Sequence, residues 1–248
     1  MPQNRAKPLH GKTVLVTGAA KRLGRAIALA AAENGANVAI TYRSSAREAG
    51  RTVVDAASFG VRAYAFECDV TDETSIRAMM KAAIAAFGRL DVLINNAANY
   101  ETVRFDKLTA RQWDAIFASN VRGPFLVSQV ALPYLRKSRG RIINLGSLGG
   151  LQAWATHAHY CSSKAALHML TKAMAKALAP EIAVNAIAPG MIDLGERAAK
   201  TFMRRMAKQT PMKRNGTGEE IAGAAMFFAS APHFITGQIL VVDGGLSR

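Results

Sequence analysis

Residues 13–24 read TVLVTGAAKRLG, and this short segment contains the first strand, turn and helix start of the chain. Its first five residues are apolar or β-branched and predict a buried strand. Apolar residues then recur at helical spacing, at Leu23, Ile27, Ala30 and Ala31. A buried strand that turns directly into a helix begins a βαβ unit, so the segment predicts a parallel sheet.

The same alternation continues along the chain, without an internal repeat or a linker rich in Pro, Gly or Ser. Near-continuous apolar strands separated by helices indicate a parallel sheet that is covered on both faces. We therefore predict a doubly wound α/β fold in which residues 1–248 form a single domain. The predicted strands are residues 13–17, 37–42, 63–68, 91–95, 141–145, 182–187 and 238–242.

Capping residues set the ends of two predicted helices. A helix over residues 73–87 begins after Thr71 or Asp72 and ends at Gly88. A helix over residues 217–231 follows the same rules. A basic, methionine-rich segment at about residues 191–216 does not read as another strand–helix unit. We predict that it is a helical insertion that forms a lid over the substrate.

Composition excludes several classes of protein. Half of the 248 residues are hydrophobic, which is enough for a sizeable core and argues against a disordered chain. The apolar runs stop far short of the ~20 residues of a membrane helix, and the first residues carry no secretory signal, so we expect a cytoplasmic protein. The two cysteines, Cys68 and Cys161, form no ligand cluster in the sequence, and no metal site is expected.

The chain is strongly basic, with 32 Lys plus Arg against 17 Asp plus Glu and a formal net charge of +15. Such a balance attracts anions, including nucleic acid, acidic proteins and phosphorylated cofactors. The basic residues are spread along the chain without an aromatic-rich basic stripe. We therefore expect no nucleic-acid partner as the main function.

Several polar residues fall where chemistry is expected. Small residues in the turn from Thr17 to Gly24 allow a pyrophosphate to approach the backbone at a helix N-terminus, although an ordinary βα turn fits this motif equally well. Tyr160 and Lys164 lie four residues apart, on one helix face. Ser147 follows a predicted strand, at the sheet edge where binding groups gather in open α/β sheets.

Taken together, these residues resemble the short-chain dehydrogenase/reductase family in order and spacing over nearly the whole chain. The resemblance implies a Rossmann-type, seven-stranded parallel sheet, a nicotinamide cofactor and a homotetramer joined through helices at residues 110–136 and about 156–179. It also implies a catalytic set of Asn120, Ser147, Tyr160 and Lys164. The matching motifs are Thr17-Gly18 with Gly24, Asp69, Asn95-Asn96-Ala97, those four residues, Pro189-Gly190, Thr236-Gly237 and Asp243-Gly244-Gly245.

The chemistry of carbonyl reduction suits this set. A hydride added to carbon leaves an alkoxide that needs a proton, and the Tyr160 phenol is the expected donor. We expect Lys164, together with the positive charge of the oxidised nicotinamide, to lower the phenol pKa from about 10 toward about 7. Ser147 is expected to bind the carbonyl oxygen and Asn120 to support a water chain. Expected cofactor contacts are Gly18, Lys21, Arg22, Leu23, Gly24, Tyr42, Arg43, Ser44, Ser45, Asp69, Val70, Asn96, Ala97, Ala98, Tyr160, Lys164, Pro189, Gly190 and Ile192.

The end of the second predicted strand favours NADPH over NADH. NAD-specific relatives carry an acidic residue there, which accepts a hydrogen bond from the ribose 2′-hydroxyl. Here no Asp or Glu occurs in residues 37–47, whereas Arg43, Ser44 and Ser45 offer donors to a 2′-phosphate. Lys21 and Arg22 lie in the adjoining turn, so we predict NADPH as the cofactor.

The substrate is less determined than the cofactor. Arg22 replaces the middle glycine of the family turn, as in the pteridine reductases that TGAAKRLG resembles, but Ser147 stands where those enzymes carry Asp. The leading expectation is a 3-oxoacyl thioester, carried on an acidic carrier protein, although the positions where such reductases bind the carrier hold Ser138 and Glu181. The alternatives are a pteridine or quinone reductase and, outside enzymes, a dinucleotide sensor or nucleic-acid binder.

Overall fold

The computed structural model describes residues 7–195 and 200–247, and its centre is a sheet of seven parallel strands. The strand order is β3-β2-β1-β4-β5-β6-β7, and every strand pairs in parallel with its neighbours. This arrangement confirms the predicted α/β fold class. The strands are β1 Thr13–Val16, β2 Asn37–Tyr42, β3 Ala63–Glu67, β4 Val92–Asn95, β5 Arg141–Leu145, β6 Ala183–Pro189 and β7 Ile239–Val242.

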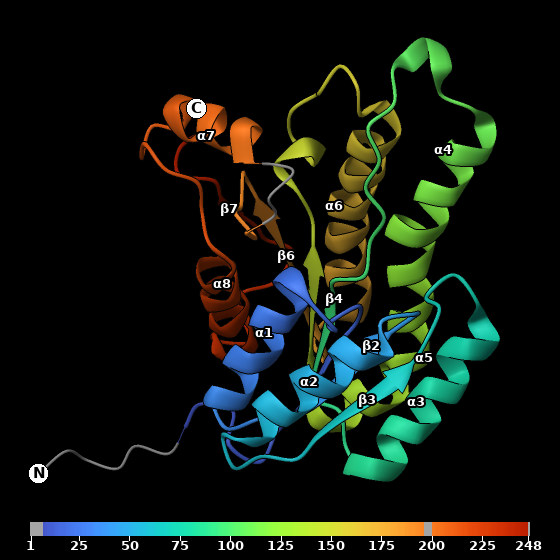
Figure 1. Cartoon of the computed structure of the whole chain (residues 1–248). Helices are drawn as coiled ribbons and strands as arrows, with labels where there is room; N and C mark the ends of the chain where they lie inside the picture. Colours follow the sequence, from blue (N-terminus) through green and yellow to red (C-terminus); the bar gives the residue numbers. More distant parts are fainter. Residues whose placement is uncertain (1–6, 196–199, 248) are drawn as a thin grey trace, which may run out of the picture.

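Helices connect the strands and cover both faces of the sheet (Figure 1). α1, α2 and α8 pack on one face, and α3, α5 and α6 pack on the other. The helices are α1 Arg22–Glu33, α2 Ala46–Ala57, α3 Glu73–Phe87, α4 Ala110–Phe117, α5 Gly123–Ser138, α6 Ala158–Leu178, α7 Lys200–Gln209 and α8 Gly218–Ser230, with short turns η1 Phe105–Lys107, η2 Ala118–Arg122 and η3 Leu148–Gly150.

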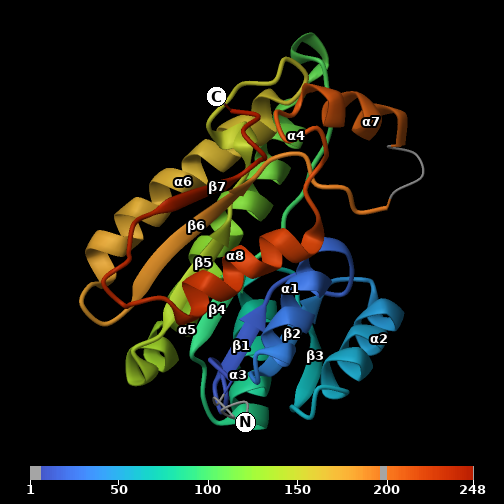
Figure 2. The ribbon, with the colours of Figure 1, turned by 90° about the vertical axis from the view of Figure 1, so that its left-hand side faces the viewer.

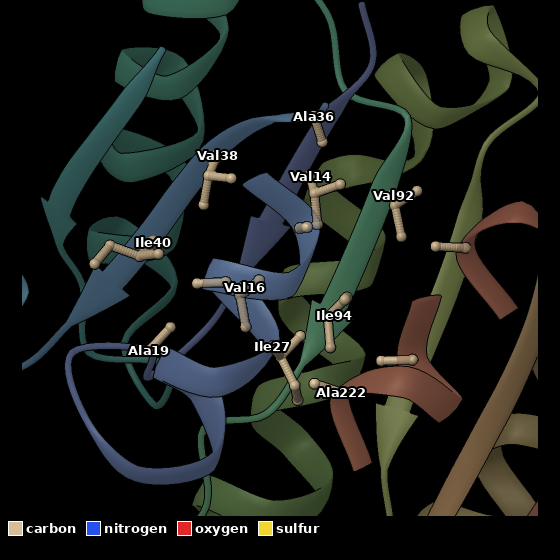
Figure 3. Packing of buried hydrophobic residues seen from close by; sticks show 14 of the residues in the cluster. Val14, Val16, Ala19, Ile27, Ala36, Val38, Ile40, Val92, Ile94 and Ala222 are labelled. Carbon is tan, nitrogen blue, oxygen red and sulfur yellow. The ribbon is translucent and has the colours of Figure 1, made fainter. Parts of the chain in front are cut away.

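Strand residues alternate between two separate hydrophobic cores. Val14 and Val16 face the core under α1 and α8, whereas Leu15 faces the core under α3 and α5. Figure 3 shows Ile27 of α1 and Ala222 of α8 close to Ile94 on the first face. Each fully buried side chain of this kind contributes about 1.5 to 3 kcal/mol, so burial on both faces accounts for the continuous apolar strands.

The caps of two helices agree with the sequence patterns. Asp72, rather than Thr71, caps α3 by accepting bonds from the backbone N–H groups of Thr74 and Ser75, and Gly88 ends it in the left-handed region at φ 77°. Thr217 and Glu220 form a reciprocal capping box at the start of α8.

A chain of buried amides links the sheet to its helices. The Asn95 Nδ2 group of β4 donates to Asn144 Oδ1 of β5 at 2.9 Å and to Ser128 Oγ of α5 at 3.1 Å. Asn144 Nδ2 then donates to Thr171 Oγ1 of α6 at 2.9 Å. Polar groups in an apolar core are tolerated because each donor finds an acceptor, and the bonds fix α5 and α6 against the two central strands.

The strand order reverses between β1 and β4, and ligands of open α/β sheets bind at the carboxyl ends of such a pair. α7 lies at the top of the molecule in both views, apart from the helices that flank the sheet (Figures 1 and 2). It belongs to the predicted lid, of which residues 196–199 lie outside the described residues, and the lid stays a prediction. Across residues 7–195 and 200–247, no helix has the length and apolar character that a membrane crossing requires.

Candidate functional site

The turn after β1 is pressed against the end of β4. Gly18 has φ 63°, and a Cβ placed on it would lie 2.9 Å from the Ala97 Cα atom. A Cβ on Gly24 would lie 2.5 Å from Asn96 Nδ2. Asn96 Nδ2 in turn donates to the carbonyl oxygens of Thr17 at 2.8 Å and Gly18 at 3.0 Å. Only glycine satisfies both positions, and the described contacts of the Asn96 side chain go to the turn itself.

This turn leads into the N-terminus of α1, whose free N–H groups and partial positive charge suit a phosphate. Lys21 and Arg22 are exposed beside it. Arg22 adopts φ 55°, the left-handed region that the family's glycine occupies without strain, and a non-glycine residue there costs about 1 kcal/mol or more. The close backbone packing and the nearby cations fit a dinucleotide.

The end of β2 lies next to this turn and carries the predicted 2′-phosphate donors. The Arg43 side chain is 63% exposed, and its Nη1 atom lies 4.0 Å from Asp69 Oδ2. Asp69 accepts bonds from the Thr71 backbone N–H at 2.9 Å and the Thr71 hydroxyl at 2.7 Å. These bonds and the Arg43 charge lower the pKa of the Asp69 carboxyl. Ser44 is exposed and Ser45 precedes α2, so this edge offers an exposed guanidinium and hydroxyls to an anion.

Ser147 lies just after β5 and is held in a fixed orientation. Its side chain is almost buried, at 6% exposure, and its Oγ atom accepts the Gly149 N–H at 3.0 Å. Its carbonyl oxygen accepts the Gly150 N–H at 2.9 Å. Because Oγ already accepts one bond from the loop, the hydroxyl proton remains able to donate to a carbonyl oxygen.

Tyr160 and Lys164 lie on successive turns of α6, beside Ser147. The Lys164 Nζ atom donates to the Leu145 carbonyl oxygen at 2.7 Å and lies 5.8 Å from the centre of the Tyr160 ring. Burial lowers the pKa of the Lys164 ammonium to about 8. Burial also raises the pKa of the Tyr160 phenol to about 12, and the Ser147 hydroxyl opposes this rise.

The sequence analysis expects the Lys164 ammonium and the charge of an oxidised nicotinamide together to bring the phenol pKa toward about 7, and this stays a prediction. Among the protein's own groups, desolvation of the phenolate outweighs the stabilising contacts, and the ammonium is directed at the Leu145 carbonyl. At neutral pH the phenol therefore carries its proton, which is the form that a proton donor requires.

Asn120 is completely buried in η2, a single π-helical turn that interrupts the helix predicted over residues 110–136. Its Nδ2 atom donates to the Asn99 carbonyl at 2.9 Å and to Ser163 Oγ at 3.1 Å, while Oδ1 accepts the Asn99 N–H at 2.8 Å. π-Helical turns often mark functional sites. Here the Asn120 side chain joins the loop after β4 to α6.

Aromatic rings surround the Tyr160 phenol. The Tyr100 ring meets it edge-on at 4.9 Å between centres, and the Trp154 ring stacks on it at 6.3 Å. His157 stacks on Tyr100 at 5.0 Å. His159 is completely buried and faces Glu101 at 3.8 Å. The rings of Tyr100 and Trp154 thus converge on Tyr160, and His157 contacts both of them.

The remaining predicted contacts also lie at strand ends. Gly190 donates its N–H to the Val242 carbonyl at 2.9 Å, and a Cβ on Gly190 would lie 2.6 Å from Asp243 Cβ. Ile192 forms an isolated bridge with Gly216. The other predicted contacts, at or near the carboxyl ends of the strands or in the first turn of α1, are Leu23, Tyr42, Val70, Ala98 and Pro189.

The sequence analysis missed His168, which the structure places under the Ser147 loop. Its side chain is buried, and its Nε2 atom accepts the Ser147 N–H at 3.4 Å. The signal available in the sequence was spacing, because His168 follows Lys164 by four residues and therefore shares its helix face.

Comparisons with known proteins agree with this geometry. A family model described as enoyl-(acyl carrier protein) reductase matches residues 18–247. A 3-oxoacyl-[acyl-carrier-protein] reductase of Staphylococcus aureus is 38% identical over 240 residues, covering 95% of this chain and 98% of the relative. The enzyme of the same name from Thermotoga maritima is 35% identical over 247 residues, 96% of this chain and 98% of the relative. A mutant of a Serratia marcescens short-chain dehydrogenase/reductase superposes with a TM-score of 0.90 at 34% identity, covering 97% of this chain and 100% of that one.

His168 predicts a specific loss of stability in acid. Burial, then the charges of Lys164 and Lys172, lower its pKa from 6.5 to about 4. Because the folded-state pKa lies below the unfolded value, the unfolded chain binds more protons, and stability is lost as pH falls through this window. We expect His168 to account for on the order of 2 kcal/mol of the loss between about pH 7 and about pH 4.5. Urea unfolding of the unmodified protein and of His168→Gln at both pH values measures this difference, and equal acid sensitivity would contradict the expectation.

Proposed function

This chain belongs to the short-chain dehydrogenase/reductase family of oxidoreductases, and we propose that it is an NADPH-dependent carbonyl reductase with Tyr160 as general acid. The observation that carries the proposal is the contact between Tyr160 and Ser147, with Lys164 beside them, at the carboxyl ends of the parallel strands. A buried phenol that keeps its proton, next to a hydroxyl free to donate, is suited to hold a carbonyl oxygen and protonate it.

The proton steps follow from the arrangement of these groups. Ser147 Oγ donates to the substrate carbonyl oxygen, since its own acceptor position is taken by the Gly149 N–H. Bound NADPH supplies the hydride to the carbonyl carbon. As negative charge grows on the oxygen, Tyr160 Oη transfers its proton there, and the Lys164 ammonium lowers the cost of the phenolate that remains. With a pKa of about 8, Lys164 can also exchange a proton near neutral pH.

The cofactor would be held along the same edge of the sheet. The N-terminus of α1, which follows the turn at Gly18, would bind the pyrophosphate through its N–H groups. Arg43, with Ser44 and Ser45, would bind the 2′-phosphate, and Lys21 adds charge from the turn. Arg22 and Leu23 at the start of α1, Asp69 and Val70 after β3, and Pro189, Gly190 and Ile192 at and after the end of β6 would complete the cofactor contacts.

We favour a 3-oxoacyl thioester as the substrate. The relatives from Staphylococcus aureus and Thermotoga maritima are named 3-oxoacyl-[acyl-carrier-protein] reductases, and the net charge of +15 would attract an acidic carrier. The Ser138 hydroxyl is engaged with the Leu90 carbonyl at 2.7 Å, so docking of a carrier near this point would depend on the exposed Lys137 and Arg139.

A second candidate substrate is a flat ring such as a pterin or a quinone. The rings of Tyr100, Trp154 and His157 around Tyr160 offer stacking surfaces that a flexible acyl chain does not need. The turn TGAAKRLG, with Arg22 in place of glycine, favours the same alternative. Against it stands Ser147, because pteridine reductases carry Asp at that position.

Exposed apolar side chains support a homotetramer formed through α4, α5 and α6. Trp113 of α4 is 37% exposed, Phe125 of α5 is 43% exposed and Met169 of α6 is 64% exposed. Large apolar groups exposed on helices are typical of surfaces that are covered in an oligomer. The two helical segments are those that the family resemblance assigns to subunit contacts.

The substrate is tested by a panel of 3-oxoacyl thioesters, dihydropterins and quinones, with NADPH oxidation followed by absorbance. We expect a 3-oxoacyl thioester to give a kcat/KM at least about tenfold above any pterin or quinone, a difference of about 1.4 kcal/mol in transition-state binding. A higher kcat/KM for a dihydropterin or quinone would favour the second candidate. Absence of turnover with every carbonyl would reject the enzymatic proposal.

Tyr160→Phe tests the proton donor. The variant keeps the ring contacts with Tyr100 and Trp154 but removes the phenolic proton, so we expect kcat to fall by at least about 10². The melting temperature and the Kd for NADPH should stay close to those of the unmodified protein. A variant that keeps most of its activity would show that another group protonates the product.

Arg43→Asp tests the choice of cofactor. We expect the unmodified protein to prefer NADPH by at least about tenfold in kcat/KM, and the variant to lose or invert this preference because Asp repels a 2′-phosphate. Arg47→Asp is the matched control, since Arg47 is an exposed arginine on α2 and its replacement makes the same change in charge. Equal loss of preference in both variants would point to general charge rather than to contact at Arg43.

A further inference from the structure

We propose that His168 is a positioning residue that holds Ser147 in the orientation needed to bind the carbonyl oxygen. The inference rests on the proposed reductase function and assigns His168 no contact with the substrate. His168 is 4% exposed, and it lies one helical turn beyond Lys164 and two beyond Tyr160 on the same side of α6. The stripe of α6 that carries the proposed acid and its lysine thus ends in a buried imidazole.

The imidazole meets Ser147 through the backbone. Its Nε2 atom accepts the Ser147 N–H at 3.4 Å. The other described bonds that hold Ser147, from the N–H groups of Gly149 and Gly150, come from its own loop and fix the loop's internal shape. Tyr160 of α6 also contacts the Ser147 hydroxyl, whereas the bond to His168 is the one described for the Ser147 backbone N–H.

The loop fits the ring closely on both sides of Ser147. A Cβ placed on Gly146 would lie 2.1 Å from His168 Nε2, and one placed on Gly150 would lie 2.7 Å from His168 Cε1. Both positions therefore exclude a side chain, because the imidazole occupies the space. Such contact on two sides means that a change in the ring's size or polarity shifts the segment that carries the Ser147 hydroxyl.

Small shifts of this segment matter for the proposed chemistry. A donor to a developing oxyanion acts at about 2.7 to 3.1 Å, and removing one such donor typically lowers kcat by about 10² to 10³. Without an acceptor at His168, the Ser147 N–H would be a buried donor without its partner, and the loop would relax to satisfy it. The Ser147 hydroxyl would then no longer be fixed relative to Tyr160.

A double-mutant cycle with Ser147→Ala separates positioning from general stability. His168→Leu removes the acceptor and keeps an apolar side chain of similar size, and we expect it to lower kcat at least about tenfold with little change in the Kd for NADPH. In the Ser147→Ala background the same change should lower kcat by less than about twofold, because the group it positions is gone. His168→Gln, whose side-chain oxygen can accept from the Ser147 N–H, should keep at least about a third of the activity.

Leu167→Ala is the matched control. Leu167 is a buried neighbour on α6 with no polar side-chain atom, so its truncation should lower the melting temperature. Any effect of Leu167→Ala on kcat should be the same factor in the unmodified protein and in the Ser147→Ala background. If His168→Leu does not fold, His168→Met replaces it in the cycle. If the enzyme is active and His168→Leu lowers kcat by the same factor with and without Ser147→Ala, the inference about His168 is wrong, while the proposed function stands. Absence of carbonyl reduction by the unmodified protein would reject the proposed function and the inference with it.

The tautomer of His168 provides a test that is independent of turnover. An Nε2 atom that accepts the Ser147 N–H carries no proton, so nitrogen-15 NMR of the unmodified protein at about pH 7 should show a neutral ring protonated at Nδ1. A ring protonated at Nε2 cannot accept this bond and would refute the proposed contact directly.

Discussion

The position of the whole site depends on the buried hydrogen bonds that run from Asn95 through Asn144 to Thr171. Parallel strands and amphipathic helices can slide past one another, because hydrophobic contact has little directional preference. Amides in an apolar core remove that freedom, since any shift would leave a donor without its acceptor. The two central strands and α6 are thereby fixed in one register, and this register brings Tyr160 opposite Ser147.

Within this frame, burial sets the electrostatic properties of the site. Removal from water raises the pKa of the Tyr160 phenol and lowers that of the Lys164 ammonium, because burial penalises the charged form of each group. Burial and the Lys164 charge likewise keep His168 neutral. A lysine, a protonated phenol and a serine hydroxyl in such a water-poor site can together stabilise negative charge that develops on an oxygen between them.

The parts of the structure that follow from local pattern were predictable, and those that depend on distant partners were not. Every strand falls within about two residues of its predicted range, because two buried faces require a continuous apolar run. The choice of Asp72 over Thr71 as helix cap depends on side-chain geometry that spacing does not contain. The direction of the Lys164 ammonium depends on a carbonyl 19 positions away, and the partner of His168 lies 21 positions away. The π-helical turn at Asn120 likewise depends on the Asn99 loop, so the sequence predicted an uninterrupted helix.

α6 carries the proposed proton donor and its buried neighbours on one rigid element, whereas the aromatic rings around the phenol come from loops. Tyr160 and His168 span about 12 Å of one helix, at 1.5 Å per residue, so they move together as a rigid unit. The surrounding rings are attached elsewhere, with Tyr100 in the loop after β4 and Trp154 in the loop after η3. Replacement of these rings changes what fits beside the phenol without disturbing the helix. The loops can therefore diverge in sequence without moving the proposed acid relative to its lysine and histidine neighbours.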